Sequence, residues 1–245
     1  MNMAWCDVHT NLDKAERYVA KCAADIVVLP EMFATGYVVD TQAVAQPADG
    51  TIVSWLRKTA AKYDRAIVGS VAIAENGKCF NRMYFAKRSG ELVWADKRHL
   101  FAIGGENRYF TAGRERIVTE YRGMRFLLLV CYDLRLPVWS RNRGDYDAII
   151  YSASWAASRR NVWRTLLRAR AMENQAYVIG VNRTGADPST KYAGDSAIVD
   201  FRGETLKEMN DSEGIADADL DLEQLVRFRN SFPTWRDADD YDLKM

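Results

Sequence analysis

The sequence has few of the features that mark several large protein classes. Its 245 residues include only 5 Pro and 15 Gly, too few for a collagenous or disordered chain. No stretch approaches the roughly 18 consecutive apolar residues that a membrane helix needs. The 34 Lys and Arg nearly balance the 33 Asp and Glu, so no overall field attracts a nucleic-acid backbone or an anionic membrane. We therefore expect a globular protein that binds neither nucleic acid nor membrane.

Cysteine and histidine are also scarce. The four cysteines are scattered without a CxxC pair, and the opening MNMAWCDV has neither the basic nor the apolar region of a secretory signal. We expect free thiols in a cytoplasmic protein rather than disulfides. With only His9 and His99, conventional ligands are too few for a structural zinc site. The sequence leaves open whether one thiol is reactive.

Apolar runs bounded by polar or turn residues recur along the chain. They predict buried strands at 25–30, 66–74, 124–131, 146–154 and 176–182. The short turns ENGK, RSGE and YRGM are typical of hairpins rather than of crossover connections. We therefore predict mixed sheets with both parallel and antiparallel pairs.

Segments with helical spacing lie between these runs. They predict helices at 12–23, 51–63 and 160–174. Thr10 and Asn11 are possible caps of the first helix. Alternation of strands and helices indicates an α/β class. Because no linker or internal repeat interrupts it, we expect a single domain over 1–245.

Two polar residues directly end buried apolar runs. Glu31 follows DIVVLP, and Cys131 closes RFLLLV. Ligands of open α/β sheets bind beyond the carboxyl ends of strands, so these positions are candidates for chemistry. Taken singly, Glu31 is as consistent with capping a turn, and a buried Cys often acts as a small apolar residue. Together they suggest a thiol nucleophile and its base.

A thiol nucleophile also needs a donor for the oxyanion that forms during attack. The loop ADKRHLF supplies Lys97 and His99. Lys97 follows a strand, and its ammonium could stabilise an oxyanion and lower the proton affinity of the thiol. His99 is the usual type of partner for a thiol, but it is equally consistent with a polar loop residue.

The segments LPEMFATGY, DKRHLF and VCYDLRLP resemble the Glu-Lys-Cys motifs of the nitrilase, or carbon-nitrogen hydrolase, superfamily. The similarity extends to ENRYFTAG, SASWAASRR and GDSAIVDFRGE. It implies a four-layer αββα sandwich of two mixed sheets flanked by helices. Within the superfamily, CYDLRLPVWSRN and FRNSFPTWRDAD look most like bacterial omega-amidases, which hydrolyse 2-oxoglutaramate.

The resemblance implies roles for individual residues. Glu31 is the general base and acid, Cys131 is the nucleophile, and Lys97 with the backbone N–H of Tyr132 holds the oxyanion. Glu106 orients Lys97 or the substrate amide. The implied reaction is hydrolysis of a small ω-amide, of the 2-oxoglutaramate or 2-oxosuccinamate type, to an acid and ammonia through a cysteinyl thioester. No metal or organic cofactor is implied.

An omega-amidase also needs an apolar wall and a cation for the distal carboxylate of its substrate. The wall candidates are Phe33, Tyr37 and Trp155. Arg159, Arg160 and Arg135 are the candidate cations, although Arg135 is better interpreted as an ion-pair partner of Asp133 or another buried acid.

The resemblance leaves other activities and an assembly question open. A nitrilase, an N-carbamoyl amidase, a metabolite-repair amidase and a catalytically silent binding subunit are the alternatives. The family implies a homodimer or a higher homo-oligomer, with helices at 134–143 and 160–174 as the candidate face. The acidic C-terminal tail, 228–245, is expected either in solvent or against a partner subunit.

Overall fold

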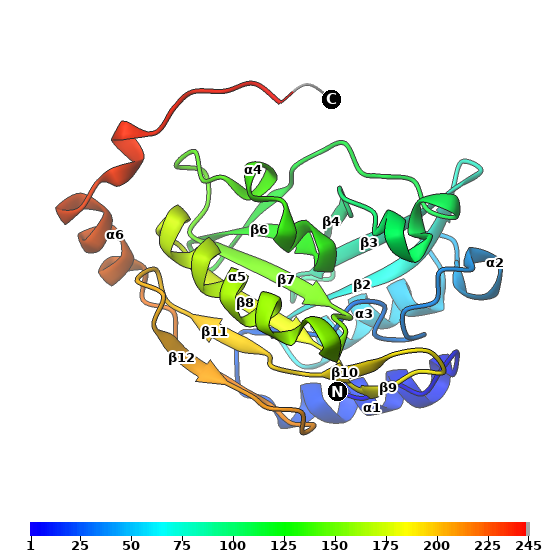
Figure 1. Ribbon diagram of the computed structural model, residues 1–245. Coiled ribbons are helices and arrows are strands. Elements are labelled where there is room, and N and C mark those ends of the chain that lie inside the picture. The colour runs from blue at the N-terminus through cyan, green and yellow to red at the C-terminus, as the bar shows by residue number, and fades with distance from the viewer. Residues whose placement is uncertain (244–245) are drawn as a thin grey trace.

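The structure, a computed structural model that describes residues 1–243, contains two large β-sheets (Figure 1). The smaller sheet has the order β1-β2-β3-β4, in which β1 and β2 are parallel and the other pairs are antiparallel. Its strands are β1 (Ile26–Val28), β2 (Ala66–Glu75), β3 (Lys78–Ala86) and β4 (Leu92–Asp96).

The second sheet has six strands in the order β12-β11-β8-β7-β6-β5. Its centre, β6-β7-β8, is parallel and its outer pairs are antiparallel. The strands are β5 (Val118–Tyr121), β6 (Met124–Val130), β7 (Ala148–Ala153), β8 (Tyr177–Asn182), β11 (Ala197–Val199) and β12 (Thr205–Glu208). A separate antiparallel pair joins β9 (Thr184–Ala186) and β10 (Lys191–Ala193).

Helices cover the outer faces of both sheets. The α-helices are α1 (Val8–Lys21), α2 (Thr41–Val44), α3 (Thr51–Lys62), α4 (Pro137–Ser140), α5 (Arg160–Asn174) and α6 (Leu222–Ser231). Short 3-10 helices are η1 (Ala102–Gly104), η2 (Glu106–Arg108), η3 (Cys131–Arg135), η4 (Ala157–Arg159) and η5 (Thr234–Asp237). α1 and α3 pack outside the four-stranded sheet, whereas α5 packs on β8 and β11 of the six-stranded sheet (Figure 1).

The alternation of side chains along β2 explains this layering. Val68 points toward the six-stranded sheet, in a core that also contains Phe126 and Leu128 of β6. Its neighbour Ile67 points the other way and packs with Leu56 of α3. Both faces of the strand are therefore buried, as its continuous apolar run requires. The result is the predicted αββα sandwich.

The elements largely agree with the sequence-based expectations. All five predicted strands, the three hairpins and the helices α1, α3 and α5 are present. The predicted caps of α1 were wrong: Asp7 caps the helix by accepting a hydrogen bond from Thr10 N, and Asn11 lies within the helix. The side chain of Asn11 instead bonds Ala4 and Ala34, a tertiary contact that local sequence does not reveal.

The predicted helix at 134–143 was also wrong. Only α4 is helical there, directly after η3. Pro137 provides a favourable first residue for α4, but Arg141 leaves helical geometry after one turn. The stretch Arg141–Gly144 instead bends, with a φ of 76° at Gly144, and is fixed by hydrogen bonds of Asn142 to Asn174 and Tyr146.

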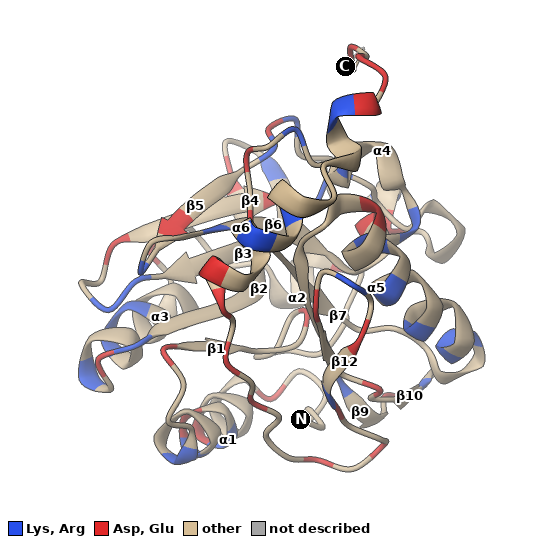
Figure 2. Ribbon diagram, turned by 90° about the vertical axis from the view of Figure 1, so that its left-hand side faces the viewer, with Lys and Arg blue, Asp and Glu red and all other residues tan. Residues whose placement is uncertain are grey.

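The surface carries mixed charge. Basic and acidic residues are interspersed along the helices and loops, in keeping with the small net charge (Figure 2). Within the described part of the chain, none of the helices has the length and apolarity needed to cross a bilayer.

Beyond α6 the described part of the C-terminal tail is largely exposed and contacts the rest of its own chain at Tyr241. The hydroxyl of Tyr241 donates to the carbonyl of Val138, and Arg143 lies over the Tyr241 ring. Phe232 and Trp235, by contrast, are exposed. Residues 244–245 of the predicted tail lie outside the described residues.

Candidate active site

Glu31 lies just beyond the carboxyl end of β1, with a fully buried side chain. One carboxylate oxygen accepts hydrogen bonds from Lys97 Nζ at 3.0 Å and Asn81 Nδ2 at 2.9 Å. The other accepts from the backbone N–H of Ser154 at 2.9 Å. The next residue, Met32, has a φ of 49° and donates its N–H to Ser70 Oγ, so the chain turns sharply after the carboxylate. The turn directs Glu31 between the two sheets.

Lys97 lies between two buried carboxylates. Its ammonium donates to Glu31 and to both oxygens of Glu106, at 3.0 and 2.9 Å. The backbone of Lys97 accepts from the N–H of Gly113, where an added Cβ would lie 2.2 Å from the Asp96 carbonyl oxygen. Only glycine fits that approach. The predicted association of Glu31, Lys97 and Glu106 is therefore present in the structure.

Asn81 joins the same cluster, although the sequence analysis missed it. It is fully buried on β3 and donates to both Glu31 and Glu106, at 2.9 and 3.2 Å. Its backbone carbonyl accepts from Lys97 N–H. The only signal in the sequence was an amide between apolar residues of the run CFNRMYF. A buried amide needs partners, so that position was a candidate for a polar contact.

Cys131 is held in a strained backbone conformation at the end of β6. Its φ of 46° is unusual for a residue with a side chain. Asp133 fixes the turn because its carboxylate accepts from Val130 N–H on one side and from His99 on the other. His99 therefore serves as a structural partner of Asp133, as its loop-residue interpretation allowed. Strain of this kind, imposed by surrounding contacts, is typical of functional residues.

The electrostatics of this cluster favour a protonated Cys131 thiol and a charged Lys97 ammonium. Burial and the Glu31 carboxylate raise the pKa of the Cys131 thiol well above its usual value, although Lys97 acts in the opposite direction. Burial alone would lower the pKa of Lys97, but Glu106 and Glu31 raise it well above its usual value. The expected lowering of the thiol's proton affinity is thus outweighed. Removal of its proton requires an adjacent base, and Glu31 lies beside it.

Comparison with known proteins identifies the family of this chain. Residues 1–230 match the family model described as carbon-nitrogen hydrolase. The chain belongs to the carbon-nitrogen hydrolase family. It is 42% identical to omega-amidase YafV of Yersinia enterocolitica, over 98% of this chain and 95% of the relative. It is 38% identical to 2-oxoglutaramate amidase of Bacillus subtilis, over 93% of this chain and 90% of the relative.

Solved structures support the same fold. The CN-hydrolase superfamily protein XC1258 of Xanthomonas campestris, which holds an arsenic adduct in its active site, superposes with a TM-score of 0.96. It shares 38% identity, over 99% of this chain and 96% of that one. Nit3 of Saccharomyces cerevisiae, from the nitrilase superfamily, superposes with a TM-score of 0.85. It shares 26% identity, over 95% of this chain and 91% of that one.

The predicted walls of this carbon-nitrogen hydrolase site lie in different environments. Tyr37 lies beside the cluster, with its ring 5.5 Å from Lys97 Nζ. Burial raises the pKa of Tyr37 above its usual range, and its buried hydroxyl has no partner among residues 1–243. Phe33 packs in the apolar core against Trp55 of α3, so we assign it a packing role. Trp155 is buried and donates its indole N–H to the carbonyl of Arg159.

The three candidate arginines differ in their partners. Arg160 is committed to Asp195, with bonds of 3.0 and 2.8 Å, which removes it as a candidate for substrate. The expected pair between Arg135 and Asp133 was wrong, because Asp133 is occupied by the backbone and His99. Arg135 lies over the Trp155 ring instead, at 5.0 Å.

Arg159 also stacks on an aromatic ring. Its guanidinium lies 5.2 Å from the centre of the Phe101 ring, and that ring packs at 5.1 Å against Tyr132, the neighbour of Cys131. Across the described residues, neither Arg135 nor Arg159 forms an ion pair, and both are half-buried. Within residues 1–243, two guanidiniums thus lack an acidic partner: Arg135 belongs to η3, which begins at Cys131, and Arg159 stacks on the ring that contacts Tyr132.

Proposed function

We propose that this enzyme hydrolyses the terminal amide of a short 2-oxo acid, 2-oxoglutaramate or 2-oxosuccinamate, to the dicarboxylate and ammonia. The observation that carries the proposal is a pair of guanidiniums without an acidic partner among the described residues: Arg135 on η3, which begins at Cys131, and Arg159 over the Phe101 ring that packs on Tyr132. A half-buried guanidinium without an acid favours a substrate carboxylate, which it binds in a bidentate manner. The names of the relatives omega-amidase YafV and 2-oxoglutaramate amidase support the same substrate class.

The proposed reaction uses the catalytic cluster of Glu31, Lys97, Glu106 and Cys131. Glu31 takes the proton of the Cys131 thiol as sulfur attacks the amide carbon. Lys97 and the backbone N–H of Tyr132 stabilise the oxyanion. Glu31 then gives the proton to the leaving nitrogen, which departs as ammonia and leaves a thioester.

Water completes the cycle. Glu31 accepts a proton from a water molecule that attacks the thioester carbon, and the C–S bond breaks to release the acid and the thiol. Glu106 keeps Lys97 directed toward the reacting carbonyl throughout, because it binds two of the ammonium's hydrogens. These steps use protein groups and water alone, so we propose that no cofactor takes part. We further propose a cytoplasmic enzyme that forms a homodimer.

Ammonia release from a panel of substrates tests the function. We expect turnover of 2-oxoglutaramate, with little from a nitrile or an N-carbamoyl amino acid of the same length. Cys131→Ala should reduce turnover by at least about 1,000-fold, because the nucleophile is lost. Cys79→Ala, which removes a thiol outside the catalytic cluster, is the matched control. Faster release from a nitrile or carbamoyl substrate would refute the amide assignment.

A further inference from the structure

The two oxyanion donors of the proposed reaction come from different sheets. Lys97 lies directly after β4 of the four-stranded sheet, whereas Tyr132 lies in η3, directly after β6 of the six-stranded sheet. Sheets that pack face to face lie about 10 Å apart and share no ladder of backbone hydrogen bonds. Groups of a catalytic site must nevertheless be held within about 0.5 Å of their productive positions. Other contacts therefore set the distance between the two donors.

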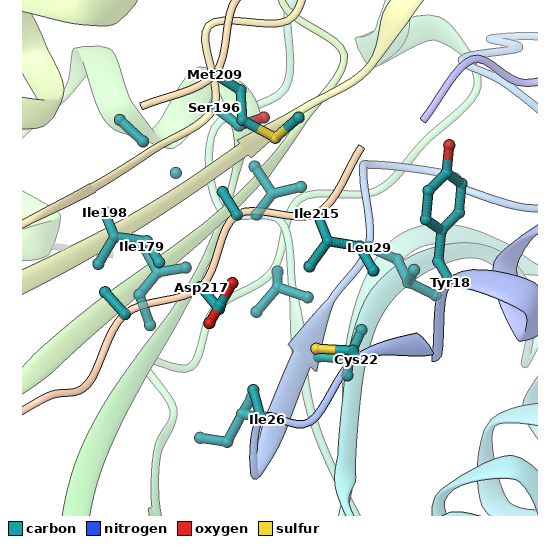
Figure 3. A pocket seen from close by; sticks show the side chains of 18 of the residues that line it. Tyr18, Cys22, Ile26, Leu29, Ile179, Ser196, Ile198, Met209, Ile215 and Asp217 are labelled. Carbon is teal, nitrogen blue, oxygen red and sulfur yellow. The ribbon is translucent and has the colours of Figure 1, made fainter. Parts of the chain in front are cut away.

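Apolar packing between the sheets is incomplete beside β1. A cavity of about 490 Å³ is lined there by residues of both sheets, among them Ile26 of β1, Leu29 directly after it and Ile179 of β8. Figure 3 shows these three side chains at the cavity. Protein interiors are usually close-packed, and close packing fixes the spacing of layers. Near this cavity, polar contacts carry more of that role.

The proposed general base has several polar contacts with the other sheet. The backbone N–H of Glu31 donates to the carbonyl of Ala153, and its side chain accepts from the N–H of Ser154. The hydroxyl of Ser154 donates to the carbonyl of Glu31, and that of Ser152 to the carbonyl of Leu29, at 3.2 and 2.8 Å. Glu31 is therefore fixed relative to the end of β7.

Lys97 is linked to the Cys131 turn through the side chains of His99 and Asp133. Asp133 is 1% exposed, and its Oδ1 accepts from both the backbone N–H and Nδ1 of His99, each at 2.8 Å. Its Oδ2 accepts from Val130 N–H at 3.0 Å, across the turn that contains Cys131. His99 is the second residue after Lys97. One carboxylate thus contacts the segments on both sides of the site.

This link has no counterpart in the rest of the described chain. Within residues 1–243, no other hydrogen bond joins 97–101 to 130–136. Among the same residues, His99 is the one basic side chain that pairs with Asp133. Because an ionised carboxylate only accepts hydrogen bonds, Nδ1 of His99 carries the hydrogen of this bond. The position of the Asp133 carboxylate therefore depends on the Nδ1–H of His99.

We propose that His99 and Asp133 are positioning residues, which hold the Lys97 ammonium and the Tyr132 N–H at the spacing that the oxyanion requires. This role rests on the proposed function, in which those two groups stabilise the oxyanion. The oxyanion forms only as sulfur attacks the amide carbon. Loss of the link should therefore lower kcat and leave KM almost unchanged.

Two amide substitutions of His99 separate its hydrogen bond from its volume. The side-chain nitrogen of Asn occupies the place of Nδ1, so His99→Asn keeps the donor to Asp133. The nitrogen of Gln lies near the place of Nε2, so His99→Gln loses that donor. We expect His99→Gln to lower kcat by about 10- to 100-fold with KM within about twofold, and His99→Asn to retain kcat within about threefold.

Ammonia release from 2-oxoglutaramate measures both constants. His9→Gln is the matched control, because the side chain of His9 is 90% exposed and pairs only with Asp13 among the described residues. His99→Ala replaces the Gln variant if that variant does not fold, with the same expected loss of kcat.

Alkylation of Cys131 by iodoacetamide gives a readout that involves no oxyanion. Sulfur displaces iodide from a saturated carbon, so the rate depends on the thiol and its base rather than on the spacing of the two donors. We expect His99→Gln to change this rate by less than about threefold while kcat falls. An equal loss of alkylation and turnover would mean that the whole Cys131 turn is disturbed, and would overturn the proposal.

Three other results would also overturn it. An unchanged kcat in His99→Gln would show that the link does not set the spacing. Equal losses in the Asn and Gln variants would assign His99 to packing on the Trp139 ring, whose centre lies 6.3 Å from that of the imidazole. A rise in KM at constant kcat would assign it to substrate binding.

Failure of the proposed function gives a different pattern. If the wild type does not hydrolyse 2-oxoglutaramate, the comparison uses the amide that it hydrolyses fastest, since attack on any amide forms an oxyanion. Retained turnover in Cys131→Ala would refute the catalytic cluster and this role together. Full activity in His99→Gln beside an inactive Cys131→Ala would refute the positioning role alone.

Discussion

At the scale of single residues, the catalytic cluster depends on contacts that neutralise buried charge. Glu31, Glu106 and Lys97 are each almost completely buried, and two carboxylates share one ammonium. Removing one partner of such a cluster leaves an uncompensated charge, which is costly. Asn81 is the neutral member that donates to both carboxylates. We therefore propose that Asn81 is a positioning residue for Glu31, the proposed general base, and for Glu106, the proposed orienting group of Lys97.

We predict that Asn81→Ala lowers kcat by about 10- to 100-fold while KM changes little, because one hydrogen bond to each carboxylate is lost. Steady-state ammonia release gives both constants, and the pH profile of kcat should change as well. Asn142→Ala removes comparable hydrogen bonds beside α5 and is the control. A rise in KM with kcat unchanged would contradict a positioning role.

Arg159 gives a second prediction for a single residue. Arg159→Gln should raise KM for 2-oxoglutaramate by about 10- to 100-fold, because a charge-assisted bond to the carboxylate is lost. Kinetics with butyramide, which has no carboxylate, should be almost unchanged. Arg160→Gln, whose guanidinium pairs with Asp195, is the matched control. Equal losses for both substrates would assign Arg159 to packing on Phe101.

At the scale of elements, the carboxylate of Asp147 links α6 to the six-stranded sheet. Asp147, just before β7, accepts from Arg125 of β6 and from Arg229 of α6, at 2.8 and 2.9 Å. Burial alone would raise the pKa of Asp147, but hydrogen bonds from Arg125 and the charges of both arginines lower it. The carboxylate thus connects three elements that are distant in the sequence.

The lowered pKa of Asp147 predicts a dependence of stability on pH. A carboxyl group with a lowered folded pKa stabilises the fold above its unfolded pKa of about 3.9, and this stabilisation is lost as pH falls through the folded value. Asp147→Asn should therefore cost roughly 2–4 kcal/mol at pH 7, because two cations lose their partner, and less below about pH 4. Urea unfolding at both pH values measures this. Asp240→Asn in the exposed tail should cost almost nothing, and a pH-independent cost for Asp147→Asn would contradict the linkage.

At the scale of the whole molecule, the sandwich leaves some apolar surface uncovered. Phe232 and Trp235 are 59% and 53% exposed at the base of the C-terminal tail. Exposed aromatic residues grouped in this way are typical of protein interfaces. The same end of the molecule holds α4 and the loop after it, against which Tyr241 packs. We therefore take this end of the molecule as the face for the proposed homodimer.

Sedimentation velocity tests the assembly. We expect the full chain to sediment as a dimer at micromolar concentration, and the double variant Phe232→Ser with Trp235→Ser to shift toward the monomer. The exposed Trp94 on β4 offers a control, since Trp94→Ser should leave the dimer intact. A wild-type chain that sediments as a monomer at all concentrations would refute the homodimer.

The sequence by itself determined most of the long elements and singled out the candidates for the proposed catalytic cluster. Strands, hairpins and the three long helices follow from local periodicity, and Glu31, Lys97 and Cys131 stand out because they follow apolar runs. Such signals are local, so they can be recognised without knowledge of the fold. Glu106 came from the resemblance to a family.

Tertiary structure alone decided which partners these residues have. Arg135, Arg159 and Arg160 look alike in the sequence, yet only Arg160 meets a buried acid, Asp195. Asn81 reaches both carboxylates from β3, which pairs with β4, the strand before Lys97, and is separated by β2 from β1, the strand before Glu31. The contact of His99 with Asp133 is likewise invisible to periodicity. The physical reason is that burial and pairing depend on distances between residues far apart in the chain, and packing of the two sheets sets those distances.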